Sequence, residues 1–132
     1  MNQTPNYNLI TTTSTIILPI IYSCKKNNMV LLTVSTASLL ASINYWRKPI
    51  LGYRRNIDIF ITNFAMITYI YYGFNIGIFY PKLVCAFNVY SMWFLYNESC
   101  KYYQLQDNNW IKYHMLFHLY ATFSQLYLIF WV

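Results

Sequence analysis

The sequence predicts an all-α, polytopic membrane helix bundle, and three observations support that fold class. Of the 132 residues, 58% are hydrophobic and only 9% are charged, which is too little charge to cover the surface of a soluble domain. The apolar residues gather in runs close to the roughly 20 residues that a helix needs to cross a bilayer. The 9 Lys and Arg residues lie at the ends of those runs, as membrane topology requires. The length fits a single integral-membrane domain over residues 1–132.

Five segments are predicted to cross the bilayer, at approximately residues 7–24, 29–46, 57–79, 83–96 and 110–132. The first is rich in threonine and contains Pro19, and the fourth is short for a full crossing. We expect a break between the third and fourth at Tyr80-Pro81-Lys82, because a proline ends one helix and begins the next. Asp107, Asn108 or Asn109 is expected to cap the last helix.

The basic residues predict the orientation of these spans. If the loop between the second and third spans faces the cytosol, six basic residues lie on that side and three lie on the other. The six are Arg47, Lys48, Arg54, Arg55, Lys101 and Lys112, and the three are Lys25, Lys26 and Lys82. The positive-inside rule therefore places the N-terminus in the cytosol and the C-terminus on the opposite side of the membrane.

The loop "RKPILGYRRN" (47–56) is the most basic stretch of the chain. Topology alone explains its four basic residues, and the sharper interpretation is contact with anionic lipid headgroups, at about 1 kcal/mol for each residue. The net charge of +6 does not indicate a nucleic-acid partner, because the basic residues are not spread over a hydrophilic face. A pore or transporter is also disfavoured, since the chain has no Gly-rich filter and no inverted repeat.

Asp58 is the acidic residue that lies well inside an apolar run, in "NIDIFITNF". A carboxylate at membrane depth costs about 2.5–3.5 kcal/mol on insertion scales, so it marks a candidate functional site. The alternative is structural. Asp58 is close to the start of its helix, where it would favour the helix dipole and pair with Arg54 or Arg55.

His114 and His118, in "KYHMLFHLYATF", are one helical turn apart and therefore share a face of the last span. This spacing allows two imidazole nitrogens to reach one metal ion. The same spacing also serves two histidines that hydrogen-bond to neighbouring helices. The pair alone does not decide between these two roles.

Topology connects the histidines and Asp58 to Ser42, near the end of the second span. A serine in a membrane helix usually bonds back to the carbonyl four residues earlier, and alone it indicates little. The second span ends on the presumed cytosolic side, and the third and fifth spans begin there. All four side chains are therefore expected in one leaflet, which indicates a common site.

At these residues the chain resembles the membrane hydrolase superfamily that unites alkaline ceramidases with the progestin and adiponectin receptors. Ser42-Ile-Asn-Tyr-Trp46 is similar to its Ser-x-x-x-His motif, and Asp58 to the aspartate at the start of the next span. His114-Met-Leu-Phe-His118 is similar to its His-x-x-x-His motif in the last span. Two features depart from the pattern. Trp46 stands where the superfamily has a histidine, and the chain has about five spans where the superfamily has seven.

The resemblance implies a zinc site with Ser42 and Asp58 as catalytic residues, serving the reacting carbonyl and the metal-bound water. It makes His114 and His118 two of the three zinc ligands. Catalytic zinc usually has three protein ligands and an open position for water, whose pKa falls to about 7. Asp58 is a chemically reasonable third metal ligand, but it would then be lost as a general base.

Two functions follow from the sequence, and whether the chain is an enzyme stays open. Because Trp46 replaces a ligand and the chain is small, we favour a non-catalytic, reduced relative that acts as a scaffold or binds lipid. The alternative is a zinc-dependent hydrolase of a lipid amide or ester at the cytosolic leaflet. The expected partners are the bilayer itself, a lipid substrate and anionic headgroups.

Overall fold

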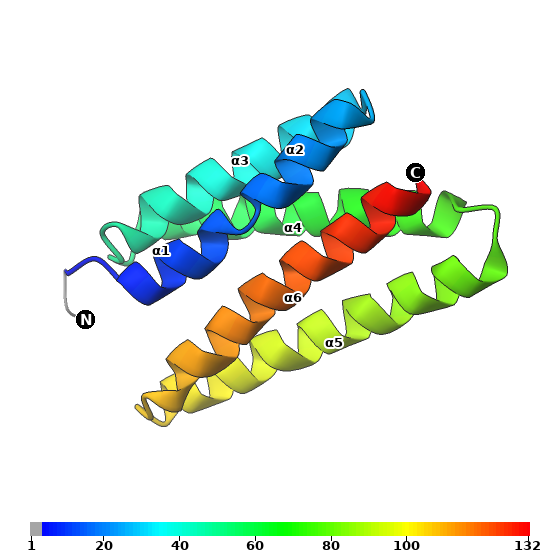
Figure 1. Ribbon diagram of the computed structural model, residues 1–132. Coiled ribbons are helices and arrows are strands. Elements are labelled where there is room, and N and C mark those ends of the chain that lie inside the picture. Colours follow the sequence, from blue (N-terminus) through cyan, green and yellow to red (C-terminus); the bar gives the residue numbers. More distant parts are fainter. Residues whose placement is uncertain (1–3) are drawn as a thin grey trace.

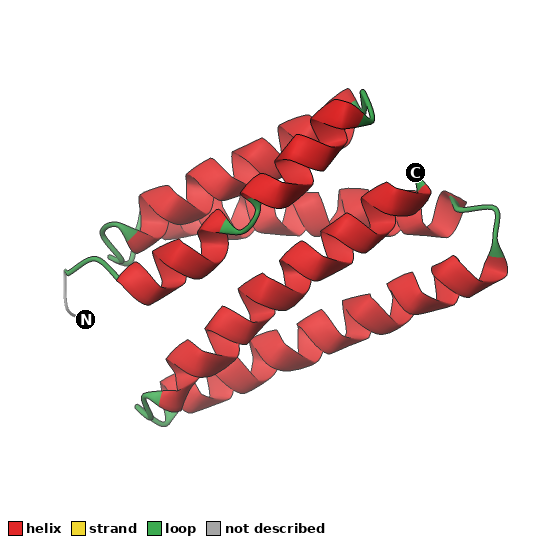
Figure 2. Cartoon of the chain, viewed as in Figure 1, coloured by secondary structure: helices red, strands yellow, loops and turns green. Residues whose placement is uncertain are grey.

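Six helices make up most of residues 4–132, the part of the chain described by this computed structural model (Figure 1). They are α1 (Tyr7–Ser14), α2 (Ile17–Lys25), α3 (Met29–Trp46), α4 (Tyr53–Asn75), α5 (Phe79–Gln104) and α6 (Asn109–Trp131). Short loops join the helices, and residues 4–132 contain no strand (Figure 2). The predicted all-α class is therefore confirmed.

The first predicted span is broken into α1 and α2, and Pro19 explains the break. A proline ring clashes with the carbonyl four residues earlier, which belongs to Thr15. At this point the chain tightens instead: the N–H groups of Thr15 and Ile16 donate to carbonyls three residues back, those of Thr12 and Thr13. The segment predicted as one helix over residues 7–24 therefore contains two short helices.

The predicted break at Tyr80-Pro81-Lys82 is wrong, because these residues lie in the first turn of α5. A proline is tolerated there, since the first N–H groups of a helix have no partner within it. The loop lies earlier, at residues 76–78, so α4 ends at Asn75 rather than Phe79. α5 also continues past the predicted end at Tyr96, through most of the polar stretch that follows, to Gln104.

Polar side chains begin three of the helices. The carboxamide oxygens of Asn6 and Asn28 accept hydrogen bonds from the N–H groups of Leu9 and Leu31, at 3.2 and 3.1 Å. At the start of α6, Asp107 accepts from the N–H of Asn109 at 2.9 Å. Each bond satisfies a donor that the first turn would otherwise leave free.

Two antiparallel pairs, α3–α4 and α5–α6, form the body of the structure (Figure 1). α1 and α2 both pack against α3 and α6, so they join one pair to the other. The loop 47–52 returns the chain from α3 to α4 and contains Gly52 with a φ of 144°, a backbone conformation that glycine adopts readily. The contact between α4 and α5 is much less extensive than that within either pair.

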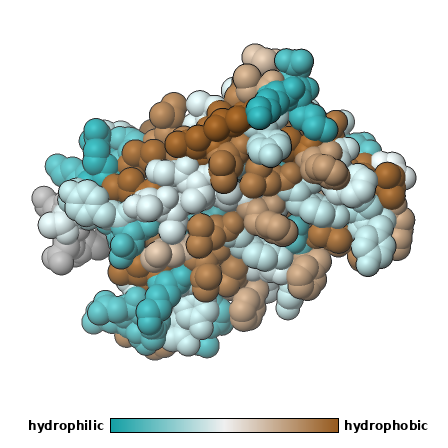
Figure 3. Space-filling view, in the orientation of Figure 1, coloured by the Kyte–Doolittle hydropathy of each residue, from teal (hydrophilic) through white to brown (hydrophobic). Residues whose placement is uncertain are grey.

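The outer faces of the helices carry many large apolar side chains (Figure 3). On α4 the most exposed include Phe60, Phe64, Ile67, Tyr71 and Phe74. Among the described residues, two helices are long and apolar enough to cross a membrane, Met29–Trp46 and Tyr53–Asn75. This surface and these two helices are consistent with membrane association.

We expect Gly73→Leu to destabilise the fold by about 1–3 kcal/mol, the usual cost of overpacking. Gly73 is buried where α4 approaches α5, and a Cβ there would lie 3.2 Å from the Cβ of Cys85. Gly77→Leu is the matched control, because a Cβ at Gly77 meets nothing within 4 Å. Loss of helicity on titration with a denaturing detergent measures both. Equal stabilities of the two variants would contradict the close approach of α4 and α5 at Gly73.

Candidate functional site

The α3–α4 hairpin places Ser42 beside Asp58. Ser42 is buried one turn before the end of α3, and Asp58 lies in the second turn of α4. The Ser42 hydroxyl donates to Oδ1 of Asp58 at 2.5 Å. The expected bond from Ser42 to its own helix backbone is therefore replaced by a bond between helices. Within residues 4–132, no ion pair joins Asp58 to Arg54 or Arg55, contrary to the structural alternative.

His118 is buried, and α1 supplies its partner. Nδ1 of His118 is hydrogen-bonded to the hydroxyl of Thr13, which is fully buried in α1. One turn further along α6, the hydroxyls of Thr122 and Thr15 are 2.7 Å apart. Both threonines of the N-terminal segment lie near its break. The broken segment is thus fixed to α6 by two hydroxyl contacts, one of which orients an imidazole.

His114 has a partner of the same kind on α5. The Ser99 hydroxyl lies 3.2 Å from the carbonyl of Trp110 and 3.1 Å from Nδ1 of His114. A carbonyl can only accept, so Ser99 donates its single proton to Trp110 and accepts from Nδ1–H of His114. That arrangement leaves Nε2 of His114 with its lone pair.

Trp46 stands against both histidines. Its ring centroid lies 5.1 Å from that of His114, in an edge-on arrangement, and 6.5 Å from that of His118. The histidine rings themselves are 4.9 Å apart. Trp46 is 6% exposed, and its Nε1–H is buried without a hydrogen-bond partner. An indole therefore fills the position next to the histidines where the resemblance leads us to expect a third imidazole.

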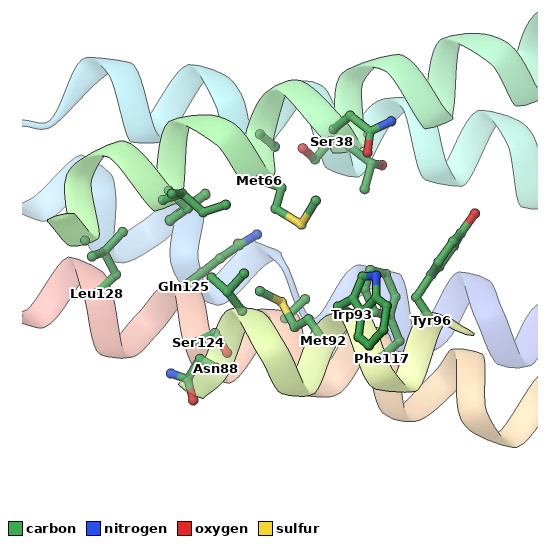
Figure 4. Close-up of a pocket in the computed structure, with 18 of the residues that line it drawn as sticks. Ser38, Met66, Asn88, Met92, Trp93, Tyr96, Phe117, Ser124, Gln125 and Leu128 are labelled. Carbon is green, nitrogen blue, oxygen red and sulfur yellow. The ribbon is translucent and has the colours of Figure 1, made fainter. Parts of the chain in front are cut away.

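One cavity of about 320 Å³ brings the predicted site residues together. Ser42, Asp58, His114 and His118 all line it, along with residues from α4, α5 and α6. Figure 4 shows α4 on one side of the space and side chains such as Met92 and Phe117 on the other. The lining of α4 extends from Asp58 to Phe74, which is about 24 Å at the helical rise per residue. The cavity is therefore long, with the predicted residues at one end.

Sequence reasoning missed the side chains that hold the histidines and those that line the far end of the cavity. Thr13 and Ser99 bond to Nδ1 of the two histidines, and Asn88 and Gln125 line the cavity. A single amide inside an apolar run is the same signal that singled out Asp58. It was present in "CAFNVYSM" and "TFSQLYL". No comparable signal distinguishes Thr13 from the other threonines around it.

The described part of the chain contains no group of three or more His, Cys, Asp or Glu side chains placed to hold a metal ion. The two histidine rings of α6 lie together, whereas Asp58 of α4 is hydrogen-bonded to Ser42 of α3. Zinc bound by His114, His118 and Asp58 stays a prediction, as do the catalytic roles of Ser42 and Asp58.

Comparison with protein-family models, with characterised proteins and with solved structures finds no match to this chain. The resemblance to the ceramidase superfamily consequently rests on the short motifs themselves. The features that the structure adds are the contact of Trp46 with both histidines and the shared cavity.

We expect Ser42→Ala to lower the free energy of unfolding by about 1–3 kcal/mol, because it leaves a half-buried carboxylate without its donor. Ser38→Ala is the matched control on the same helix. Ser38 is equally buried, but its hydroxyl donates only to the carbonyl of Val34, at 2.9 Å, and losing such a bond changes stability little. Detergent unfolding followed by circular dichroism compares the two. A loss in Ser42→Ala no larger than in Ser38→Ala would show that the Ser42–Asp58 bond contributes nothing.

Proposed function

We propose that this chain is a polytopic membrane protein that binds a lipid in the cavity between α4, α5 and α6, without catalysing its hydrolysis. The observation that carries the proposal is Trp46, whose indole packs against both histidines at the polar end of that cavity. Ser42, Asp58 and the two histidines still lie together at that end of the cavity. The position where a third metal ligand is expected is filled by an apolar ring.

The lengths and exposed apolar side chains of α5 and α6 support the proposal that these helices also cross the membrane, in addition to α3 and α4. α5 and α6 contain 26 and 23 residues, or about 39 and 35 Å, enough for a hydrocarbon core of about 30 Å. Both expose large apolar side chains, including Phe87 and Phe123. Tyr and Trp gather at the helix ends, as at Trp110 and Trp131 of α6, where interfacial residues are enriched. We propose that α1 and α2 together make one crossing and that α3 to α6 each make another, with the N-terminus cytosolic and the C-terminus on the opposite side.

The cavity has the chemistry of a lipid site. Its walls are mainly apolar and its length along α4 is about 24 Å, whereas one leaflet of the hydrocarbon core is about 15 Å deep. The polar end holds the Ser42–Asp58 pair, and the basic stretch 47–56 lies between these two residues in the sequence. If the headgroup of a lipid lies at that end, its hydrocarbon chain packs against Met66 and Met92. Methionine side chains adapt readily to flexible ligands.

One observation favours the alternative, a zinc-dependent hydrolase of a lipid amide or ester. Metal-binding histidines almost always hydrogen-bond through the nitrogen that does not hold the metal. In His114 and His118 both Nδ1 atoms have a hydroxyl partner, which leaves Nε2 of each for a metal. Asp58 and Ser42 line the same cavity. Zinc held by the histidines and Asp58 would polarise a carbonyl or supply hydroxide.

Lipid binding is tested with stearoylethanolamine, a neutral lipid amide, since a carboxylate headgroup would be repelled by Asp58. We expect the protein in detergent to bind it and Met66→Trp to weaken binding on the order of tenfold, about 1.4 kcal/mol. Met66 points into the cavity from α4 (Figure 4), so an indole there fills the space of the chain. Native mass spectrometry counts the bound lipid.

Met29→Trp is the matched control, because Met29 is 67% exposed at the start of α3 and lies outside the cavity. It makes the same substitution without filling the space. No binding by the unsubstituted protein, or equal losses in both variants, would overturn the proposed site.

Zinc content separates the two functions. We expect Trp46→His to bind about one zinc ion per chain in elemental analysis, because it supplies a third imidazole and catalytic sites commonly use three protein ligands. The unsubstituted protein is expected to hold much less. Stoichiometric zinc in the unsubstituted protein that disappears in His114→Ala would overturn the non-catalytic proposal and establish the alternative. A Trp46→His variant that folds but takes up no zinc would remove the argument based on Trp46.

A further inference from the structure

A second polar group lies along the cavity, away from the predicted site. Gln125 and Ser124 of α6 and Asn88 of α5 all line the cavity. Oε1 of Gln125, Oγ of Ser124 and Nδ2 of Asn88 are buried, and none has a hydrogen-bond partner. Asn88 is 4% exposed and Ser124 is 9% exposed. Buried polar atoms are nearly always paired, so three unpaired ones at one level of the bundle require an explanation.

The amide of Asn88 is held in place rather than free to turn. Its Oδ1 accepts a hydrogen bond from the Tyr120 hydroxyl at 2.8 Å, and its Nδ2 has no partner. Ser124 is one helical turn beyond Tyr120, so Asn88 lies at the same level of the bundle as Ser124 and Gln125. The side chain of Gln125 projects into the space toward Met66 of α4 (Figure 4).

The rise of α6 per residue gives the distance between this second polar group and the histidines. Gln125 follows His114 by 11 residues (125 minus 114) on α6, which is about 16 Å. One leaflet of the hydrocarbon core is about 15 Å deep. In the proposed orientation the second polar group therefore lies inside the hydrocarbon core, where water is scarce and an unpaired amide is costly.

We propose that Gln125, at the level of Asn88 and Ser124, forms a hydrogen-bonding subsite for a hydroxyl group near the middle of the bound lipid's chain. This inference rests on the proposed lipid-binding function and adds a ligand class to it: a long-chain lipid amide hydroxylated in its chain. A hydroxyl both donates and accepts, so it can pair with an amide oxygen and with an amide N–H. An unsubstituted hydrocarbon chain can pair with neither.

The test compares three neutral ligands in detergent by native mass spectrometry. They are stearoylethanolamine, the same lipid with a hydroxyl near the middle of its chain, and the same lipid with a hydroxyl beside its carbonyl. We expect the mid-chain hydroxyl to strengthen binding about fivefold over the plain lipid, the size of one net hydrogen bond. The hydroxyl beside the carbonyl lies about one leaflet away from Gln125 and should give no such gain.

Gln125→Met removes the amide while keeping the length of the side chain, and we expect it to abolish the fivefold preference. Gln104→Met is the matched control, since Gln104 is exposed at the end of α5 and lies outside the cavity. Binding of plain stearoylethanolamine by Gln125→Met shows that this variant is folded. If that variant does not bind it, Ser124→Ala, which removes only a hydroxyl, is expected to reduce the preference instead.

Failure of the proposed subsite and failure of the proposed lipid-binding function give different results in these experiments. Plain and mid-chain-hydroxylated lipids that bind equally well would overturn the subsite and leave the lipid site standing, with water as the partner of Gln125. A preference that survives in both Gln125→Met and Ser124→Ala would also overturn the subsite. If none of the three lipids binds the unsubstituted protein, the proposed function itself fails.

Discussion

The packing of Trp46 against the two histidines of α6 is the constraint on which the rest of the structure depends. Trp46 ends α3, and its carbonyl accepts the N–H of Asn6, so the entry to α1 is fixed at the same point. Leu9 and Tyr45 complete a buried cluster around it. The indole thus joins α1, α3 and α6 in one contact, and the positions of Thr13 and Ser42 follow from that contact. An apolar ring packs these helices together at the polar end of the cavity.

This arrangement explains how a polar cluster persists in a chain with so few charges. Three polar side chains at that end are each paired with a neutral hydroxyl from another helix: Asp58 with Ser42, His118 with Thr13, and His114 with Ser99. Hydrogen bonds between membrane helices are individually modest, but each of these bonds joins a different pair of helices. The cluster therefore specifies how the helices fit together as well as lining the cavity.

Helix bounds could be predicted from the sequence where an apolar run begins and ends with the helix. They could not be predicted where contacts with other helices determine the bounds. α3 has the predicted bounds and α6 differs by one residue at each end, because an apolar run and a polar cap agree there. The polar residues 97–104 are helical because Ser99 is buried against α6 and Tyr102 stacks on Tyr113, at 5.0 Å, contacts that no local pattern contains. Ser42, Asp58 and the histidines could be placed at one end of the bundle from the direction of the spans alone. Their hydroxyl partners could not, since these depend on the register between α1, α5 and α6.

The limited contact between α4 and α5 has a consequence for how a ligand reaches the cavity. If the proposed lipid binding takes place in a bilayer, the seam between these two helices would face the hydrocarbon, and a lipid would enter sideways from its own leaflet without passing through water. Occupancy is then governed by the mole fraction of the lipid in the membrane rather than by its aqueous concentration. A minor membrane component can saturate such a site even when its solubility in water is negligible. The protein would in this way respond to the composition of the membrane that surrounds it.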